Sequence, residues 1–313
     1  MKAVFLDAGT LGQDVDLAPI EAVTGQLVKY PRTSPDQALG RIRGFDTVLV
    51  NKVVLGGEHF TACPELKTIA VVATGLNNID RQAAGDHGIT VMNVSNYGRS
   101  TVAQHTIALM LALATRLLDY DRDVRAGRWA DSHMFCLMDH PIMELEGRTL
   151  GVVGYGDLGQ GVVERAKAFG MNILLGARPG QPTGEHDGIP RVSIDELLTR
   201  SDVVSLHCLL TGETRNLIGE RELAMMKSSA LLINTSRGGL VDEQALADAL
   251  RRGTIAGAGF DVLTEEPPRN GNPLLAGDIP NLIVTPHSAW ASREARQRIV
   301  EITARNLRGQ TGH

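Results

Sequence analysis

"TLGVVGYGDLGQGVVERAKAFG", residues 149–170, decides the fold of more than half of this chain. An apolar run typical of a buried strand leads into G-x-G-x-x-G, and a helical pattern follows at once. Glycines at these places allow a tight turn, close approach of a pyrophosphate to the helix N-terminus, and close helix–strand packing. The sequence therefore predicts a dinucleotide-binding turn, although a purely structural glycine turn has the same letters. Its residues are Gly154, Tyr155, Gly156, Asp157, Leu158 and Gly159.

The next strand candidate, "NILLGARPG" at residues 172–180, bears on which nicotinamide cofactor would bind. Folds with such a turn often carry an Asp or Glu at this strand's end, where it binds ribose hydroxyls and repels a 2′-phosphate. Here Ala177 and Arg178 stand instead, and a guanidinium can pair with a phosphate. We therefore expect NADP(H) to be favoured, with NAD(H) possible. The alternative is that Arg178 is a solvated residue on a Pro-Gly loop.

Short β-rich runs alternate with helical patterns along the whole chain, which is typical of parallel sheets covered by helices. The first set of strand candidates is 2–8, 26–30, 46–52, 66–74 and 89–95. The second set is 148–156, 172–177, 202–208, 229–236, 256–263 and 281–287. The pattern predicts two α/β domains with sheets of five and six strands, and an exposed loop over 177–190. The final helix, 292–309, could return to the first domain, but its spacing does not prove it.

Residues 101–118, "TVAQHTIALMLALATRLL", form the most apolar segment of the chain. The unbroken apolar run within it, 107–114, is far shorter than the roughly 20 residues that a bilayer requires. We expect a buried helix that packs on its own domain and also against another domain or subunit, because it is apolar on nearly every face. A homo-oligomer follows as an expectation.

Composition excludes several classes of protein. The 313 residues are 43% hydrophobic and 21% charged, with a formal net charge of −5, so no basic surface for nucleic acid or anionic membrane is expected. The three cysteines Cys63, Cys136 and Cys208 are widely spaced, which fits neither a disulfide framework nor a zinc site. The N-terminus meets Asp7 and Gly9 too early for a signal peptide, and we expect a cytoplasmic protein.

Three polar residues stand at the ends of three predicted strands. Arg237 follows "LLINTS", Glu266 lies just beyond "AGFDVL", and His287 closes "NLIVTP". Ligands of doubly wound sheets bind at the carboxyl ends of strands, so these side chains could meet in one crevice. An arginine can bind the carboxylate of a 2-oxo acid, a histidine can donate a proton to its carbonyl, and a carboxylate can orient that histidine. Taken alone, an Arg or Glu is more often a solvated surface residue, and a His after Thr-Pro is more often a loop or core residue. Three such residues at matching strand ends after a dinucleotide turn favour a joint functional role.

An ordered series of motifs resembles the D-isomer-specific 2-hydroxyacid dehydrogenase family. The motifs are "GVVGYGDLG", "LHCLLTGETRNLIG", "LLINTSRGGLVDEQAL", "GAGFDVLTEEPP" and "TPHSAW". The resemblance is strong from "VVATGLNNID" onward and extends over the first 65 residues only in layout. It implies two Rossmann-like parallel-sheet domains, one flavodoxin-like and one doubly wound, with an active-site cleft between them. The substrate domain would be 1–99 plus 287–313, the dinucleotide-binding domain 100–286, and the assembly a homodimer.

The resemblance also implies roles for particular residues. Arg237, Glu266 and His287 take the positions of the family's substrate-binding arginine, supporting glutamate and acid/base histidine. The backbone at Thr74, Gly75 and Leu76 would bind the substrate carboxylate. Further residues would border the cofactor: Thr101, His207, Cys208, Thr235, Ser236 and Asp261. The position that carries Asp in NAD-preferring relatives falls on Ala177, with Arg178 next.

Within the family, "VVATGLNNID" and "VLVNKVVL" look most like glycerate dehydrogenases, also called hydroxypyruvate reductases. The implied reaction reduces hydroxypyruvate and glyoxylate to D-glycerate and glycolate. Lys52 could reach into the substrate pocket, or be a solvated lysine at a strand end. Glu266 in place of Gln disfavours the formate dehydrogenase branch, whereas D-lactate, phosphonate and phosphoglycerate dehydrogenases remain alternatives. A non-catalytic, dinucleotide-sensing protein like the family's corepressors is the alternative from another functional class.

Overall fold

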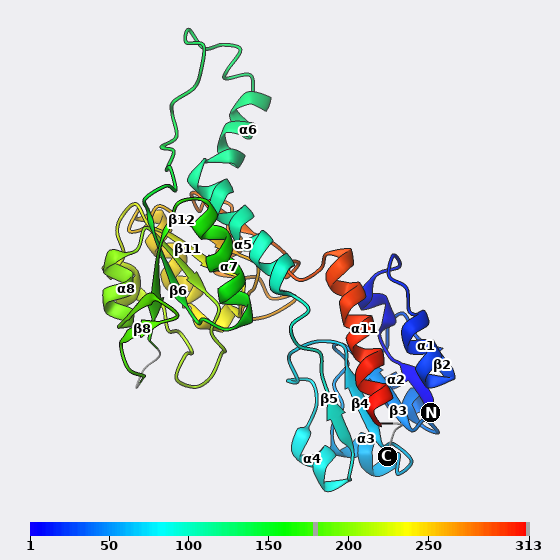
Figure 1. The fold of residues 1–313 in the computed structure, drawn as a ribbon. Coiled ribbons are helices and arrows are strands. Elements are labelled where there is room, and N and C mark those ends of the chain that lie inside the picture. Colours follow the sequence, from blue (N-terminus) through cyan, green and yellow to red (C-terminus); the bar gives the residue numbers. More distant parts are fainter. Residues whose placement is uncertain (178–180, 311–313) are drawn as a thin grey trace. The chain divides into compact units, whose positions relative to one another are not determined.

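Two compact α/β units make up the chain in the computed structural model, which describes residues 1–177 and 181–310 (Figure 1). The first unit consists of Met1–Gly98 and the residues from Ala291 onward, and the second is Arg99–Trp290. Residues 287–290, which the resemblance assigned to the substrate domain, group with the second unit. The reason is that the backbone nitrogens of His287, Ser288 and Ala289 all donate to Asp261 of that unit.

A five-stranded parallel sheet in the order β2-β1-β3-β4-β5 forms the centre of the first unit. All five expected strands are present, and β3 and β4 are buried throughout, as parallel strands covered on both faces are. The elements are β1 Lys2–Phe5, α1 Ala18–Thr24, β2 Gln26–Lys29, α2 Pro35–Ile42, β3 Thr47–Val50, α3 Gly57–Ala62, β4 Thr68–Val71, α4 Arg81–Asp86, β5 Thr90–Met92 and α11 Arg293–Gln310, with a 3-10 turn at Ala8–Leu11.

Helix α11 belongs to the first unit and packs against α1 (Figure 1). Its Arg296 donates one hydrogen bond to the carbonyl of Leu11 and another to the carboxylate of Asp14. The hydrogen bond to Asp14 lowers the pKa of that carboxyl to about 2. Further along the helix, Asn306 Nδ2 donates to the carbonyl of Asn93 over 3.0 Å. These bonds to Leu11, Asp14 and Asn93 of the first unit place the helix, a point on which the sequence pattern was not decisive.

An eight-stranded sheet forms the second unit, in the order β13-β12-β11-β10-β6-β7-β9-β8. Strand order runs outward in both directions from β6 and β10, so the carboxyl ends of these two strands flank the point where ligands bind in such sheets. The elements are α5 Arg99–Ala114, α6 Leu117–Arg125, β6 Thr149–Val153, α7 Asp157–Ala168, β7 Asn172–Gly176, β8 Gly184–His186, β9 Ile189–Val192, α8 Ile194–Arg200, β10 Val203–Leu206, α9 Glu220–Met225, β11 Leu231–Asn234, α10 Glu243–Arg251, β12 Gly257–Phe260 and β13 Leu282–Val284, with 3-10 turns at Gly238–Leu240 and Pro273–Leu275.

The exposed loop expected at 177–190 is wrong in part, because β8 and the start of β9 lie within it. These strands form an antiparallel hairpin, and β9 also pairs in parallel with β7, which gives eight strands rather than six. The turn is Asp187-Gly188, with φ of 52° and 72°. Two positive φ values in a two-residue loop make the type I′ turn for which Asp-Gly is a favoured sequence. The signal was present in the sequence among many other turn formers.

The apolar segment 101–118 is helical, but it is not one helix. Helix α5 ends at Ala114, Arg116 takes a left-handed conformation with φ of 54°, and α6 begins at Leu117 with a bend of 58° between the two axes. Residues of α5 such as Met110 and Leu113 are buried in the second unit. Among the described residues, no single helix has the length and apolarity to cross a membrane, and only this bent pair passes when its two parts are taken together.

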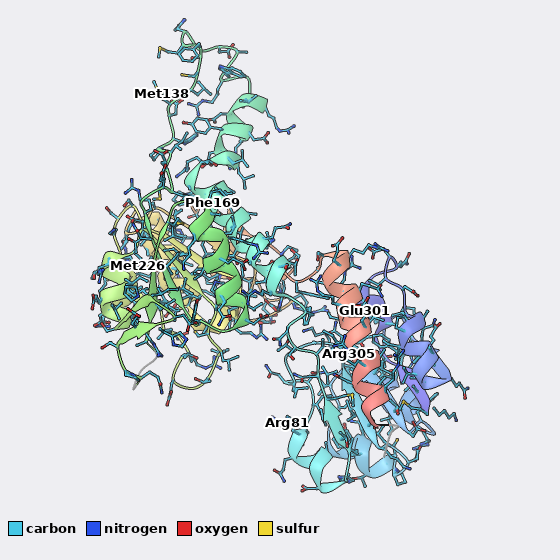
Figure 2. All side chains as sticks on the ribbon, viewed as in Figure 1. Arg81, Met138, Phe169, Met226, Glu301 and Arg305 are labelled. Atoms are coloured by element: carbon cyan, nitrogen blue, oxygen red, sulfur yellow. The ribbon has the colours of Figure 1, made fainter. Side chains whose placement is uncertain are left out.

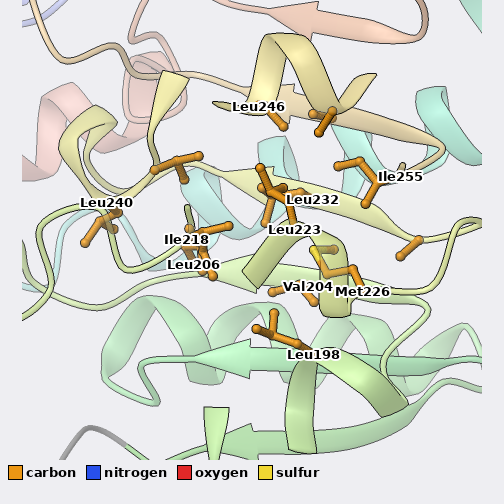
Figure 3. Close-up of a cluster of buried hydrophobic side chains, with 14 of the residues drawn as sticks. Leu198, Val204, Leu206, Ile218, Leu223, Met226, Leu232, Leu240, Leu246 and Ile255 are labelled. Carbon is orange, nitrogen blue, oxygen red and sulfur yellow. The ribbon is translucent and has the colours of Figure 1, made fainter. Parts of the chain in front are cut away.

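The core of the second unit includes a cluster of buried aliphatic side chains from β10, β11, α8, α9 and α10 (Figure 3). Beside it, Ser205 of β10 is fully buried and its Oγ lies 2.8 Å from Nε2 of His207. The other ring nitrogen, Nδ1, is buried and makes no hydrogen bond within the described residues. Burial lowers the pKa of His207 from 6.5 to about 4, because desolvation penalises the imidazolium.

His207 should therefore destabilise the second unit as pH falls. Between pH 6.5 and 4 the unfolded chain binds a proton at this residue that the folded chain does not, so the free energy of unfolding rises with pH over this window. From pH 7.5 to pH 5 the wild type should lose about 2 kcal/mol relative to His207→Gln, at roughly 1.4 kcal/mol per pKa unit. Urea unfolding followed by tryptophan fluorescence measures this, since Trp129 and Trp290 both lie in the second unit. Parallel pH profiles for the two proteins would contradict the expectation.

Candidate active site

The glycine turn lies at the carboxyl end of β6, and each glycine has a distinct steric reason. Gly154 has φ of 98°, and a β-carbon there would lie 2.5 Å from the backbone nitrogen of Cys208. A β-carbon at Gly159 would lie 2.1 Å from the carbonyl oxygen of Gly154, so helix α7 can begin at once only with glycine. A β-carbon at Gly156 would meet nothing within 4 Å. That open space at the N-terminus of α7 fits a dinucleotide pyrophosphate, and we find the turn suited to hold one.

Two aromatic or charged contacts hold this turn in place. Arg99, at the start of α5, donates to Asp157 over 3.3 Å. The ring of Tyr155 lies edge-on to that of His186, with 5.5 Å between centroids, which fastens hairpin β8–β9 to the turn. The His186 contact was missed by sequence reasoning, because it depends on the unforeseen hairpin.

At the end of β7, Ala177 is buried and its backbone nitrogen donates to the carbonyl of Val192 on β9. It offers no carboxylate to a ribose. Arg178 lies outside the described residues.

The other residues expected to border the cofactor all make bonds within the protein. Ser236 Oγ donates to the carbonyl of Cys208, Thr235 Oγ1 lies 2.9 Å from Thr106 Oγ1, and Thr101 Oγ1 donates to the carbonyl of Ala289. The first bond joins the residues after β11 to those after β10. The other two bonds join α5 to the residues after β11 and to the loop after β13. His207 adds the buried, unpartnered Nδ1 described above.

His287 and Glu266 form a close pair. Nδ1 of His287 lies 2.6 Å from Oε2 of Glu266, and Oε1 of Glu266 accepts the backbone N–H of Leu263. The carboxylate thus fixes the imidazole from one side. Both side chains are one-third exposed, and Nε2 of His287 has no hydrogen-bond partner in the part of the chain that the structure describes. The arrangement leaves Nε2 available for proton exchange with a ligand.

Asp261, only 1% exposed, fixes the loop that carries His287. Its Oδ1 accepts the backbone N–H of Ser288 and its Oδ2 that of Ala289, while its own carbonyl accepts the N–H of His287. His287 has a left-handed backbone conformation with φ of 53°, an uncommon state for a non-glycine residue that these bonds maintain. Sequence reasoning assigned Asp261 to the cofactor and missed this supporting role.

Arg237 is exposed at the end of β11, and its Nη1 donates to the carbonyl of Ser236. Buried Asn234 shapes the turn, because its Nδ2 donates to the carbonyl of Arg237 and its Oδ1 accepts the N–H of Ser236. A β-carbon at Gly238 would lie 2.0 Å from the carbonyl carbon of Leu263. The segment after Arg237 therefore packs directly on the segment that leads to Glu266.

The remaining expected residues belong to the first unit, at the carboxyl ends of β3 and β4. Lys52 is exposed, and its backbone nitrogen donates to Asp7. The backbone nitrogens of Thr74, Gly75 and Leu76 donate no hydrogen bond among the described residues. Three consecutive amides without acceptors can bind a carboxylate. No group of three or more His, Cys, Asp or Glu side chains in the described ranges is arranged to hold a metal ion.

Comparisons with known proteins show the family of this chain. The family model described as "D-isomer specific 2-hydroxyacid dehydrogenase, NAD binding domain" matches residues 107–289. The chain is 46% identical to a glycerate dehydrogenase of Methylorubrum extorquens, covering 98% of this chain and 95% of the relative. It is 38% identical to a hydroxypyruvate reductase of Blautia hydrogenotrophica, covering 98% of this chain and 96% of that relative.

A solved structure titled an acyclic imino acid reductase in complex with NADPH and D-Arg is similar with a TM-score of 0.86 and 29% identity, covering 99% of this chain and 97% of that one. The fold, the glycine turn at the switch point, the family model and the full-length relatives lead to one conclusion. This chain belongs to the D-isomer specific 2-hydroxyacid dehydrogenase family.

Proposed function

We propose that this protein reduces small 2-oxo acids to D-2-hydroxy acids with a nicotinamide cofactor, and that hydroxypyruvate and glyoxylate are its main substrates. The observation that carries the proposal is the His287–Glu266 pair, fixed at 2.6 Å on strand ends of the sheet that holds the glycine turn. The names of the glycerate dehydrogenase and hydroxypyruvate reductase relatives support the choice of substrate.

The mechanism follows from the chemistry of each group. A bound nicotinamide supplies the hydride that is added to C2 of the 2-oxo acid. Arg237 binds the substrate carboxylate and polarises the carbonyl. In the first unit, the amides of 74–76 are available to a carboxylate. Nε2 of His287 donates a proton to the carbonyl oxygen of the 2-oxo acid. Before this transfer, the Glu266 carboxylate stabilises the imidazolium through Nδ1, and it thereby directs Nε2 away from the carboxylate.

We also propose a preference for NADP(H) over NAD(H). Buried Ala177 leaves the end of β7 without the carboxylate that would repel a 2′-phosphate. Arg178, by its place in the sequence, can supply the pairing guanidinium, and the structural relative titled with NADPH supports this choice. Gly156 and its open surroundings would hold the pyrophosphate, which is common to both cofactors.

A cytoplasmic setting with a small-molecule substrate fits these features. Cys63, Cys136 and Cys208 are free thiols, as in proteins of a reducing compartment. The net charge of −5 supports neither a nucleic-acid nor an anionic membrane partner.

We propose a homodimer formed through the segment 117–142, here called the arm. It comprises α6 and the following loop, which extends from the second unit, with Met138 on the loop (Figures 1 and 2). Phe135 is 88% and Met138 76% exposed, and Trp129, Met134 and Ile142 are each more than half exposed. Several large apolar side chains exposed along one segment favour an interaction surface. At the base of the arm, Pro141, Ile142 and Met143 line a cavity of about 350 Å³ into which a second copy could pack.

A panel of kcat/KM values for hydroxypyruvate, glyoxylate and pyruvate, each with NADPH and NADH, tests substrate and cofactor together. We expect hydroxypyruvate with NADPH to give the highest value.

Arg178→Ala should reduce the ratio of kcat/KM with NADPH to kcat/KM with NADH about ten- to hundredfold, the worth of one charge-assisted hydrogen bond. Arg200→Ala, which alters an exposed arginine on α8, is the control and should leave the ratio unchanged. Cofactor binding without turnover of any 2-oxo acid would indicate a sensor rather than an enzyme, and an unchanged ratio in Arg178→Ala would refute the proposed pairing.

His287→Ala should lower kcat by about 10²- to 10⁴-fold, the usual contribution of a general acid, with the Kd for NADPH unchanged. Glu266→Gln should give a smaller loss, because the ring loses its orienting charge but retains a hydrogen-bond acceptor. Glu265→Gln is the matched control, since this neighbouring carboxylate bonds to Asn270 and not to His287. Near-normal turnover by His287→Ala, or equal losses in both glutamate variants, would count against the assignment.

Phe135→Asp combined with Met138→Asp should convert the dimer to a monomer, measured by sedimentation equilibrium, because a charge on each apolar position prevents burial. Leu275→Asp, at a 48% exposed residue outside the arm, should remain dimeric. A dimer that survives the double substitution would exclude the arm as the interface.

A further inference from the structure

Asp7, which follows β1, has an environment that the proposed mechanism does not explain. Its side chain is only 4% exposed, and both oxygens accept backbone N–H groups from the turn after the neighbouring strand β3. Oδ1 accepts from Asn51 over 2.8 Å, and Oδ2 accepts from Lys52 over 2.6 Å and from Val53 over 3.3 Å. One carboxylate therefore fixes three consecutive residues at the carboxyl edge of the first sheet.

Maintaining a carboxylate in this place has a cost. Burial raises the pKa of the Asp7 carboxyl above its usual range, and the three N–H groups together with the charge of Lys52 oppose that rise. A neutral side chain would avoid the cost of burial, but no neutral residue of this size presents two acceptors and no donor. In an exposed turn at a strand end, water would ordinarily accept these backbone N–H groups. Here the Asp7 carboxylate accepts them instead, and the geometry requires Asp.

The turn that Asp7 fixes is also bonded to the loop after β4. Asn78 Nδ2 donates to the carbonyl of Val53 over 2.9 Å, and the backbone N–H of Leu55 donates to the carbonyl of Asn78 over 2.9 Å. Strands β1, β3 and β4 are adjacent in the sheet. The segment around Lys52 and the open amides of 74–76 are therefore parts of one hydrogen-bonded edge.

We propose that Asp7 is a positioning residue, which holds the Lys52 ammonium and the amides of 74–76 in the arrangement that binds an anionic 2-oxo acid. The inference deepens the proposed function and rests on it. Asp7 touches neither substrate nor cofactor, and acts through the backbone of 51–53. Its effect should fall on substrate affinity, because the proton donor and the glycine turn belong to other strands.

Asp7→Asn tests this directly. The amide retains one acceptor, but its NH₂ group faces a backbone N–H, so the Asn51–Val53 turn must shift. We expect KM for hydroxypyruvate to rise about tenfold or more, since misplacement of about 1 Å is costly at a binding site, with kcat and the Kd for NADPH within about twofold of wild type. Asp202→Asn is the matched control, because Asp202 is 6% exposed, against 4% for Asp7, and accepts the N–H of Thr149 at the amino end of β6. The control should lose stability without a change in KM.

A double-mutant cycle separates positioning from general destabilisation. Because Asp7 acts in part through Lys52, the rise in KM of Asp7→Asn/Lys52→Met should be smaller than the product of the two single-variant rises, whereas independent effects would multiply. Asn78→Ala, at a less buried residue, provides a second variant should Asp7→Asn fail to fold, and should show the same coupling to Lys52.

Equilibrium binding of oxalate to each variant, followed by calorimetry without cofactor, distinguishes the two proposals. Oxalate should bind the wild type and bind Asp7→Asn and Lys52→Met about tenfold or more weakly, with similar deficits, at about 1.4 kcal/mol per tenfold change. Turnover by the wild type with unchanged KM and oxalate affinity in Asp7→Asn would overturn the positioning role alone. Absent turnover with variant-sensitive oxalate binding would overturn only the proposed function. Multiplicative effects of Asp7→Asn and Lys52→Met, or no binding of oxalate by the wild type, would also overturn the positioning role.

Discussion

Close backbone contact at the glycine turn is the constraint on which the second unit depends. The end of β6 reaches the end of β10 because Gly154 has no β-carbon to meet Cys208, and α7 starts immediately because Gly159 has none to meet Gly154. The absence of a β-carbon has the same effect at Gly238, where the end of β11 packs on the residues after β12. Gly154 and Gly238 thus allow close packing between the residues that follow β6 and β10 and between those that follow β11 and β12, while Gly159 allows α7 to start beside β6.

Much of this architecture could be predicted, because the signals are local. Apolar runs identified the five strands of the first sheet and six of the second, and glycine spacing located the turn. Two local features were misjudged for physical reasons. Asp187-Gly188 was one turn signal among many in a Gly- and Pro-rich stretch, and the helix break at Arg116 requires a left-handed conformation that an arginine rarely adopts.

The supporting bonds of the site could not be read from the sequence, because they join residues far apart along it. Asp261 is bonded to the backbone at 287–289, and Asp7 to the backbone at 51–53. An Asp after an apolar strand is equally common as a ligand, a cap or a solvated residue, and only the fold reveals which backbone groups it meets. For this reason the candidate residues Arg237, Glu266 and His287 were named from the sequence, whereas the backbone-fixing roles of Asp7 and Asp261 were not.

The buried aspartates and Glu266 show how one functional group performs two tasks. Asp7 and Asp261 are almost wholly buried and use both carboxylate oxygens on backbone amides, so their charge serves to fix loops. Glu266 divides its oxygens, with Oε1 on the N–H of Leu263 and Oε2 on Nδ1 of His287. The first bond prevents the carboxylate from rotating, and the second leaves Nε2 as the ring nitrogen without a partner among the described residues. Glu266 remains one-third exposed, whereas the two aspartates are almost wholly buried. Exposure, rather than residue type, therefore separates the carboxylates that fix backbone from the one that hydrogen-bonds an imidazole.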